Sequence, residues 1–85
     1  MRVRVLYFAS LREAVGVSGE ELQLPADVST AGALRAWLRA RGAPWDEALA
    51  ERRALWVAIG QAMAGPQSGL RDGAEVAFFP PVTGG

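Results

Sequence analysis

Two glycines, Gly84 and Gly85, stand at the end of the sequence and are the first residues whose chemistry deserves a hypothesis. Glycine has no Cβ, so a Gly-Gly end can pass through a narrow channel and leaves the terminal carbonyl open to attack. A carboxylate on Gly85 is inert until activated. Adenylation by ATP and then transfer of sulfur would convert it to a thiocarboxylate. An end that merely frays is the competing interpretation of these two residues alone.

The composition excludes most other chemistry. The 85 residues contain no Cys and no His, and all nine basic residues are Arg, so Lys is absent too. Thiolate nucleophiles, histidine bases, Schiff-base lysines and the usual zinc sites are therefore ruled out. The carboxylates are scattered, so we expect no metal site, no permanently bound cofactor and no self-contained active site. Any enzymatic role would depend on a larger complex.

The charge and the hydropathy of the sequence limit the partners and the location to be expected. Nine acidic residues balance the nine basic ones, and the formal net charge is 0. This balance argues against a nucleic-acid partner or a polybasic membrane contact. No segment is long and apolar enough for a membrane span, and the first residues lack a secretory apolar region. We expect one soluble, cytoplasmic domain.

The residues that must position the tail form a recognisable pattern of elements. Alternation predicts strands over 2–8, 20–24, 55–59, 62–64 and 75–79. The spacing of Leu34, Trp37 and Leu38 predicts a main helix over 30–41 with these side chains in the core. Shorter helices are predicted over 10–15, capped by Ser10, and over 45–53. We interpret Glu20, Glu21 and the arginines as solvated surface.

This order of elements predicts an α+β fold. A hairpin, a long helix and further strands favour a mixed sheet covered on one face by the main helix. A right-handed crossover would place the first and last strands side by side in parallel, which is the β-grasp (ubiquitin-like) arrangement. Residues 1–81 would form the domain and residues 82–85 a reactive tail. Pro80 and Pro81 would stop the last strand, and the tail, if extended, would reach about 13–14 Å further.

The same alternation places large aromatic residues on the charged face of the sheet. Phe8 shares a face with Arg2 and Arg4, and Phe79 shares a face with Glu75. Trp56 would join them. Exposed aromatic side chains beside a functional tail favour a binding surface, although strand twist could instead bury the rings.

Two blocks of sequence resemble one known family. The run DGAEVAFFPPVTGG over 72–85 and the run VLYFASLRE over 5–13 are similar to the small subunits of molybdopterin synthase, which are ubiquitin-like sulfur carriers. The resemblance extends weakly through the middle of the chain. Gly60-Gln61 replaces an Asn-containing turn of the family, and residues 65–69 are unusually rich in Gly and Pro.

The resemblance implies a mechanism and partners. A ubiquitin-activating-like enzyme would use ATP to adenylate Gly85, which would become a thiocarboxylate. A large subunit would supply the catalytic residues, in a heterotetramer, and sulfur would pass to cyclic pyranopterin monophosphate to give molybdopterin. Family positions at the partner interface match Phe8, Met63, Phe79, Pro80, Pro81, Val82 and Thr83.

Two alternatives stay open. A sulfur carrier of another pathway, such as the thiazole-forming one of thiamin biosynthesis, would use the same tail chemistry. A ubiquitin-like interaction module without any covalent step would tolerate the loss of Gly85.

Overall fold

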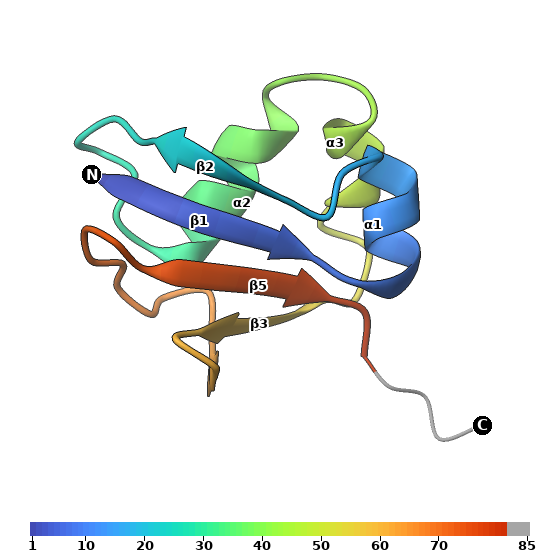
Figure 1. The fold of residues 1–85 in the computed structure, drawn as a ribbon. Coiled ribbons are helices and arrows are strands. Elements are labelled where there is room, and N and C mark those ends of the chain that lie inside the picture. The colour runs from blue at the N-terminus through green and yellow to red at the C-terminus, as the bar shows by residue number, and fades with distance from the viewer. Residues whose placement is uncertain (82–85) are drawn as a thin grey trace.

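The strands nearest the two ends of the sequence lie side by side in the centre of one five-stranded sheet (Figure 1). The computed structural model describes residues 1–81. Its strands are β1 (Arg2–Tyr7), β2 (Gly19–Gln23), β3 (Trp56–Ile59), β4 (Ala62–Ala64) and β5 (Glu75–Phe79). Its helices are α1 (Ala9–Val15), α2 (Ala31–Arg39) and α3 (Trp45–Ala48).

The sheet order is β2-β1-β5-β3-β4. β1 and β5 are parallel, with Arg4 opposite Glu75 and Tyr7 opposite Phe78, and every other pair of neighbouring strands is antiparallel. The predicted mixed sheet and its parallel central pair are therefore confirmed. Because β1 and β5 are parallel, β5 ends at the same end of the sheet as β1, beside α1 (Figure 1).

The core lies between the sheet and α2. Along β1 the alternate residues Val3, Val5 and Tyr7 are buried, as the sequence predicts. From α2, Leu34 and Leu38 are completely buried. Full burial of one such leucine contributes about 1.5–3 kcal/mol. Trp37, predicted as core, is only half-buried and packs against the edge of this cluster.

The Gly- and Pro-rich segment 65–70 is fixed to the first turn of α2. The N–H groups of Ala31 and Gly32 donate to the carbonyls of Ser68 and Pro66, at 3.0 and 2.8 Å. The third free N–H, that of Ala33, donates to the Thr30 hydroxyl at 3.1 Å. These contacts satisfy donors that a helix start leaves without an intrahelical partner. A Cβ on Gly32 would lie 2.9 Å from the Pro66 carbonyl oxygen, so this close approach requires glycine.

Two helix predictions need correction. Ser10 does not cap α1, because the helix begins one residue earlier and Phe8 occupies the cap position without a side-chain hydrogen bond. The predicted helix over 45–53 ends at Ala48. The turn predicted at Gly60-Gln61 is present, and both residues have positive φ, at 57° and 70°. Among residues 1–81, none of the helices combines the length and apolarity that crossing a membrane requires.

Candidate functional site

A row of apolar residues crosses all five strands on the outer face of the sheet, away from α2. Leu6 on β1 lies opposite Gly19 on β2 and Ala77 on β5. Ala77 in turn lies opposite Ala58, which lies opposite Met63 at the far edge. We call these five residues the apolar row. A Cβ on Gly19 would come within 2.8 Å of the Leu6 side chain, so Leu6 covers this glycine.

A second row, nearer the end of β5, is aromatic. It consists of Phe8, Phe79 and Trp56, and we call it the aromatic row. Trp56 lies opposite Phe79, and their rings meet edge to face with centroids 6.0 Å apart. Phe8 follows β1, and its N–H donates to the carbonyl of Phe78 at 3.3 Å. Edge-to-face contact stabilises an aromatic pair by about 0.5–1.5 kcal/mol beyond its buried area.

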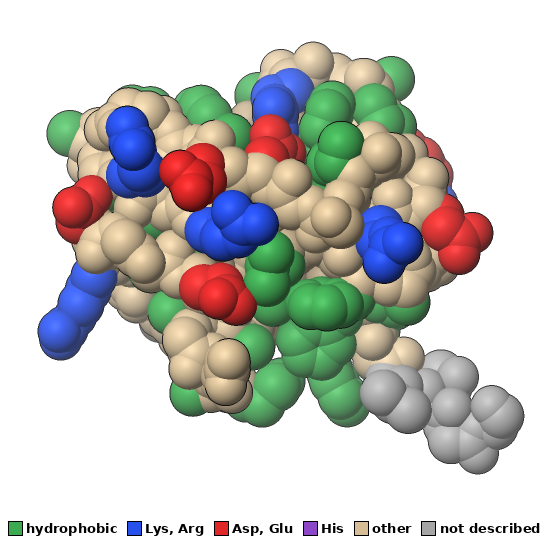
Figure 2. Space-filling model, in the orientation of Figure 1, with side chains coloured by type: hydrophobic (Ala, Val, Ile, Leu, Met, Phe, Trp, Pro, Cys, Tyr) green, Lys and Arg blue, Asp and Glu red, His purple; other side chains and the backbone are tan. Residues whose placement is uncertain are grey.

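The aromatic row is open to solvent, as the alternation predicts. Phe8 is 47% exposed, Trp56 is 43% exposed and Phe79 is half-buried. Met63, at the end of the apolar row, is 63% exposed. Hydrophobic side chains gather on this face around the end of β5 (Figure 2). Contiguous exposed apolar surface of this kind is typical of a protein-binding site.

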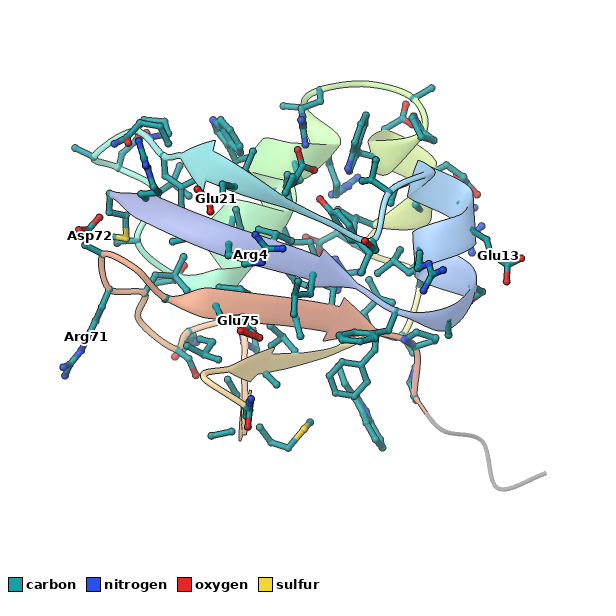
Figure 3. All side chains as sticks on the ribbon, viewed as in Figure 1. Arg4, Glu13, Glu21, Arg71, Asp72 and Glu75 are labelled. Atoms are coloured by element: carbon teal, nitrogen blue, oxygen red, sulfur yellow. The ribbon has the colours of Figure 1, made fainter. Side chains whose placement is uncertain are left out.

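On its other side the apolar row is bordered by charges. Glu21, Arg4 and Glu75 lie opposite one another across β2, β1 and β5 (Figure 3). Arg4 is 3.7 Å from the Glu21 carboxylate, and both side chains are exposed. An apolar centre with a charged border suits a protein interface, because the charges orient a partner that the apolar area binds.

The aromatic row adjoins the place where the described chain ends. Pro80 and Pro81 follow Phe79 directly and are half-buried, and the strand does not continue through them. A cavity of about 250 Å³ opens beside Pro80, between α1 and α3, and its wall includes Arg53. Of the site residues predicted from sequence, Phe8, Phe79, Pro80 and Pro81 are thus brought together, and Met63 lies one row away. Val82, Thr83, Gly84 and Gly85 lie outside the described residues.

The sequence interpretation missed a partly buried polar network behind the site. The Tyr7 hydroxyl donates to Glu20 at 2.8 Å and accepts from the Trp45 indole at 3.2 Å. Arg41 donates two hydrogen bonds to Glu20, both 2.9 Å, and its guanidinium stacks on the Trp45 ring at 4.2 Å. Glu20 and Arg41 are therefore not simply solvated, contrary to the prediction. The network ties β1 and β2 to Arg41, which follows α2, and to Trp45, the first residue of α3.

The pKa values in this network follow from its geometry. Burial, with the hydrogen bond to Glu20, raises the pKa of Tyr7 well above its usual range, so the hydroxyl remains a donor. The Arg41 hydrogen bonds hold the pKa of Glu20 below its ordinary value. Glu20 therefore stays ionised at neutral pH and keeps both partners.

Arg35 makes a second set of long-range contacts that the sequence did not reveal. Its guanidinium donates to the carbonyls of Leu49, Ala50 and Arg53, at 2.8, 2.6 and 2.9 Å. These carbonyls belong to the segment predicted as helix. The guanidinium gives the irregular backbone after Ala48 the hydrogen bonds that a longer helix would have supplied. Arg35 thereby fixes the connection that leads to Trp56 and the aromatic row.

The Glu20–Arg41 pair should stabilise the fold measurably. We expect Arg41→Gln to lower the free energy of unfolding by about 1–2 kcal/mol at pH 7, because the pair is bidentate and only 20% and 31% exposed. The matched control Arg4→Gln breaks an exposed, longer pair and should cost less than about 1 kcal/mol. Urea unfolding of the three proteins measures both differences.

The same pair predicts a pH dependence. A folded-state pKa of Glu20 below its ordinary value of 4.5 means that the stabilisation is complete above pH 4.5. It is lost as the pH falls through the folded pKa, where Glu20 takes a proton. The difference in unfolding free energy between wild type and Arg41→Gln should therefore be constant from neutral pH down to 4.5 and shrink below it. A difference that persists undiminished in acid would assign it to packing.

The described residues offer no site for a metal ion. Residues 1–81 contain no group of three or more His, Cys, Asp or Glu side chains that could hold one.

The comparisons with known proteins agree with this geometry. The ThiS family profile matches residues 5–85. A molybdopterin synthase sulfur carrier subunit of Haemophilus influenzae is 46% identical over 83 residues, which cover 98% of this chain and 99% of that protein.

Two solved structures share the fold. A Pyrococcus furiosus protein, provisionally named molybdopterin converting factor subunit 1, superimposes with a TM-score of 0.79 at 27% identity, over 96% of this chain and 99% of that one. A complex of subunits 1 and 2 of the molybdopterin-converting factor from Helicobacter pylori contains a chain with a TM-score of 0.64 at 23% identity, covering 100% of both chains. With a full-length relative at 46% identity and a family profile that spans all but the first four residues, this β-grasp chain belongs to the ThiS family.

Proposed function

We propose that this chain is the sulfur carrier of a molybdopterin synthase and that the carboxylate of Gly85 holds the sulfur. The observation that carries the proposal is the position of the aromatic row at the point where β5 gives way to Pro80 and Pro81. A partner that binds this surface would receive the four residues that follow. The name of the Haemophilus influenzae relative supports the same role.

The chemistry at Gly85 takes two steps. A carboxylate oxygen of Gly85 attacks the α-phosphorus of ATP and pyrophosphate leaves, which gives an acyl-adenylate. Sulfide (HS⁻) released by a donor then attacks the carbonyl carbon, a C–S bond forms, AMP leaves with the electron pair of the broken C–O bond, and the sulfur loses its proton to solvent. The product is a thiocarboxylate, whose sulfur can pass to cyclic pyranopterin monophosphate. ATP would be bound by a ubiquitin-activating-like partner rather than held permanently by this chain.

In this proposal the domain and the tail have separate roles. Residues 1–81 would act as the recognition domain, and residues 82–85 as the arm that enters a partner's active site. The large subunit would contact Phe8, Met63 and Phe79, with Pro80 and Pro81 at the entrance and Val82 and Thr83 inside. The Helicobacter pylori complex is named for two different subunits, which supports such a pairing, and a heterotetramer of two small and two large subunits is our expectation.

Reconstitution tests the function. The thiocarboxylated chain, mixed with the large subunit and cyclic pyranopterin monophosphate, should yield molybdopterin and return the Gly85 carboxylate, both measured by mass spectrometry. The unmodified chain is the matched control and should yield none. If the thiocarboxylated chain instead supplies sulfur only to a thiazole-forming enzyme, it serves the thiamin pathway.

A further inference from the structure

We propose that the chain is built to keep its own amines away from the activated Gly85 carbonyl, so that only an external nucleophile can capture it. The inference rests on the proposed function, because only an activated carboxylate needs this protection. Two features carry it: the nature of the basic side chains, and the position of the amine on Met1.

An amine is the hazard for an acyl-adenylate. The nitrogen attacks the carbonyl carbon, a C–N bond forms, the C–O bond to AMP breaks, and the amine loses a proton to water. The resulting amide is a dead end for a carrier. Lysine, with an ordinary pKa near 10.4, presents about 0.1% free amine at pH 7.5, whereas a guanidinium stays protonated and does not attack. All nine basic residues are Arg.

Contacts do not require arginine at every one of these positions. Arg35 and Arg41 use the forked guanidinium geometry, on three carbonyls and on a carboxylate. Within residues 1–81, however, the exposed side chains of Arg2, Arg12 and Arg71 make no hydrogen bond or ion pair. A lysine would serve solvation equally well there. Protection from acyl capture gives a chemical reason for arginine at position 12, on the helix that shares a cavity wall with Pro80, whereas Arg2 and Arg71 lie at the far end of the sheet.

The fold holds the remaining amine, that of Met1, far from the tail. The Met1 amino group donates to the Leu24 carbonyl at 3.2 Å, at the opposite end of the sheet from Pro81 (Figure 1). Arg4 is level with Glu75, so Met1 lies three residues behind Glu75 and Phe79 four residues ahead. At roughly 3.3 Å per residue this separates Met1 from Phe79 by about 23 Å. Four residues beyond Pro81 reach about 13–14 Å, which is too short to return.

The test uses an activated Gly85 that needs no partner enzyme. The chain is prepared with an alkyl thioester on Gly85, as wild type and as two variants that keep their charge. Arg53→Lys places an amine on the wall of the cavity beside Pro80, and Arg71→Lys places one at the far end of the molecule (Figure 3). Intact mass at pH 8 follows each protein. Self-capture gives a product one water lighter than the hydrolysed acid.

We expect Arg53→Lys to cyclise at least about tenfold faster than Arg71→Lys, because only the nearer amine shares a high effective concentration with the tail. Wild type should only hydrolyse. Cyclisation of wild type through Met1, or equal behaviour of all three proteins, would overturn the proposal. Because the thioester is made chemically, this outcome is independent of whether an activating enzyme adenylates Gly85, which is measured separately.

Discussion

Phe79→Ala is expected to weaken binding of the large subunit by about 30-fold or more, which corresponds to about 2 kcal/mol. Phe79 is the centre of the aromatic row, in edge-to-face contact with Trp56 and one residue before Pro80. A partner that covers this row would bury all three rings, and interface aromatics of this kind dominate binding energy. Phe8→Asp should act in the same direction, because it places a charge in the desolvated contact.

The neighbouring residue provides the control. Phe78 lies on the same strand, is only 2% exposed and faces the core. Phe78→Ala should cost about 3–5 kcal/mol of stability and leave the affinity of the molecules that remain folded unchanged. Phe79→Ala and Phe8→Asp should do the opposite. Urea midpoints and calorimetric titration with the large subunit separate the two effects. Severe unfolding of Phe79→Ala with normal affinity per folded molecule would show that the aromatic row is structural.

The sheet could be predicted because one of its faces packs against the core and the other faces water. Val3, Val5 and Tyr7 alternate with Arg2 and Arg4, and a one-residue shift would put charges into the core. The same alternation predicts that Phe8 and Phe79 lie on the outer face, where the structure has them. The turn at Gly60-Gln61 and the edge strand after it follow from local sequence alone, since both depend on neighbouring residues.

The contacts that escaped prediction join residues far apart in the sequence. Glu20 and Arg41 are separated by 21 positions, and each alone resembles an ordinary surface residue. Only the fold places them around Tyr7. The end of α3 at Ala48 escaped for a similar reason, because the carbonyls beyond it are satisfied by Arg35 on another helix. Helical periodicity carries no information about such a distant donor.

Incubation with the activating enzyme, ATP and a sulfur donor is expected to change the mass of the chain by one exchange of oxygen for sulfur. Fragmentation should place the change in Gly85. Intact-mass and fragment-ion measurements on the same sample give both results. Without ATP the mass should not change, because the carboxylate has no leaving group until it is adenylated.

Two altered ends serve as controls for this experiment. A chain without Gly84 and Gly85 should unfold at the same temperature as the full chain, since the core is assembled from residues of the sheet and α2. It should accept no sulfur. A chain with one residue added after Gly85 should also remain unmodified, because its terminal carboxylate would no longer lie at the depth that a fitted active site requires.

Sulfur is assigned to Gly85 in part because the chain lacks the side chains that usually carry it. A carrier must hold sulfur on a group that can release it, and the 85 residues include no thiol. A thiocarboxylate, ionised at neutral pH and a soft nucleophile, meets the requirement without cysteine. The two glycines put no side chain in the way of either the adenylating or the accepting active site. Sulfur found on any other residue, or an extended chain that is modified and active, would show that the carrier works by different chemistry.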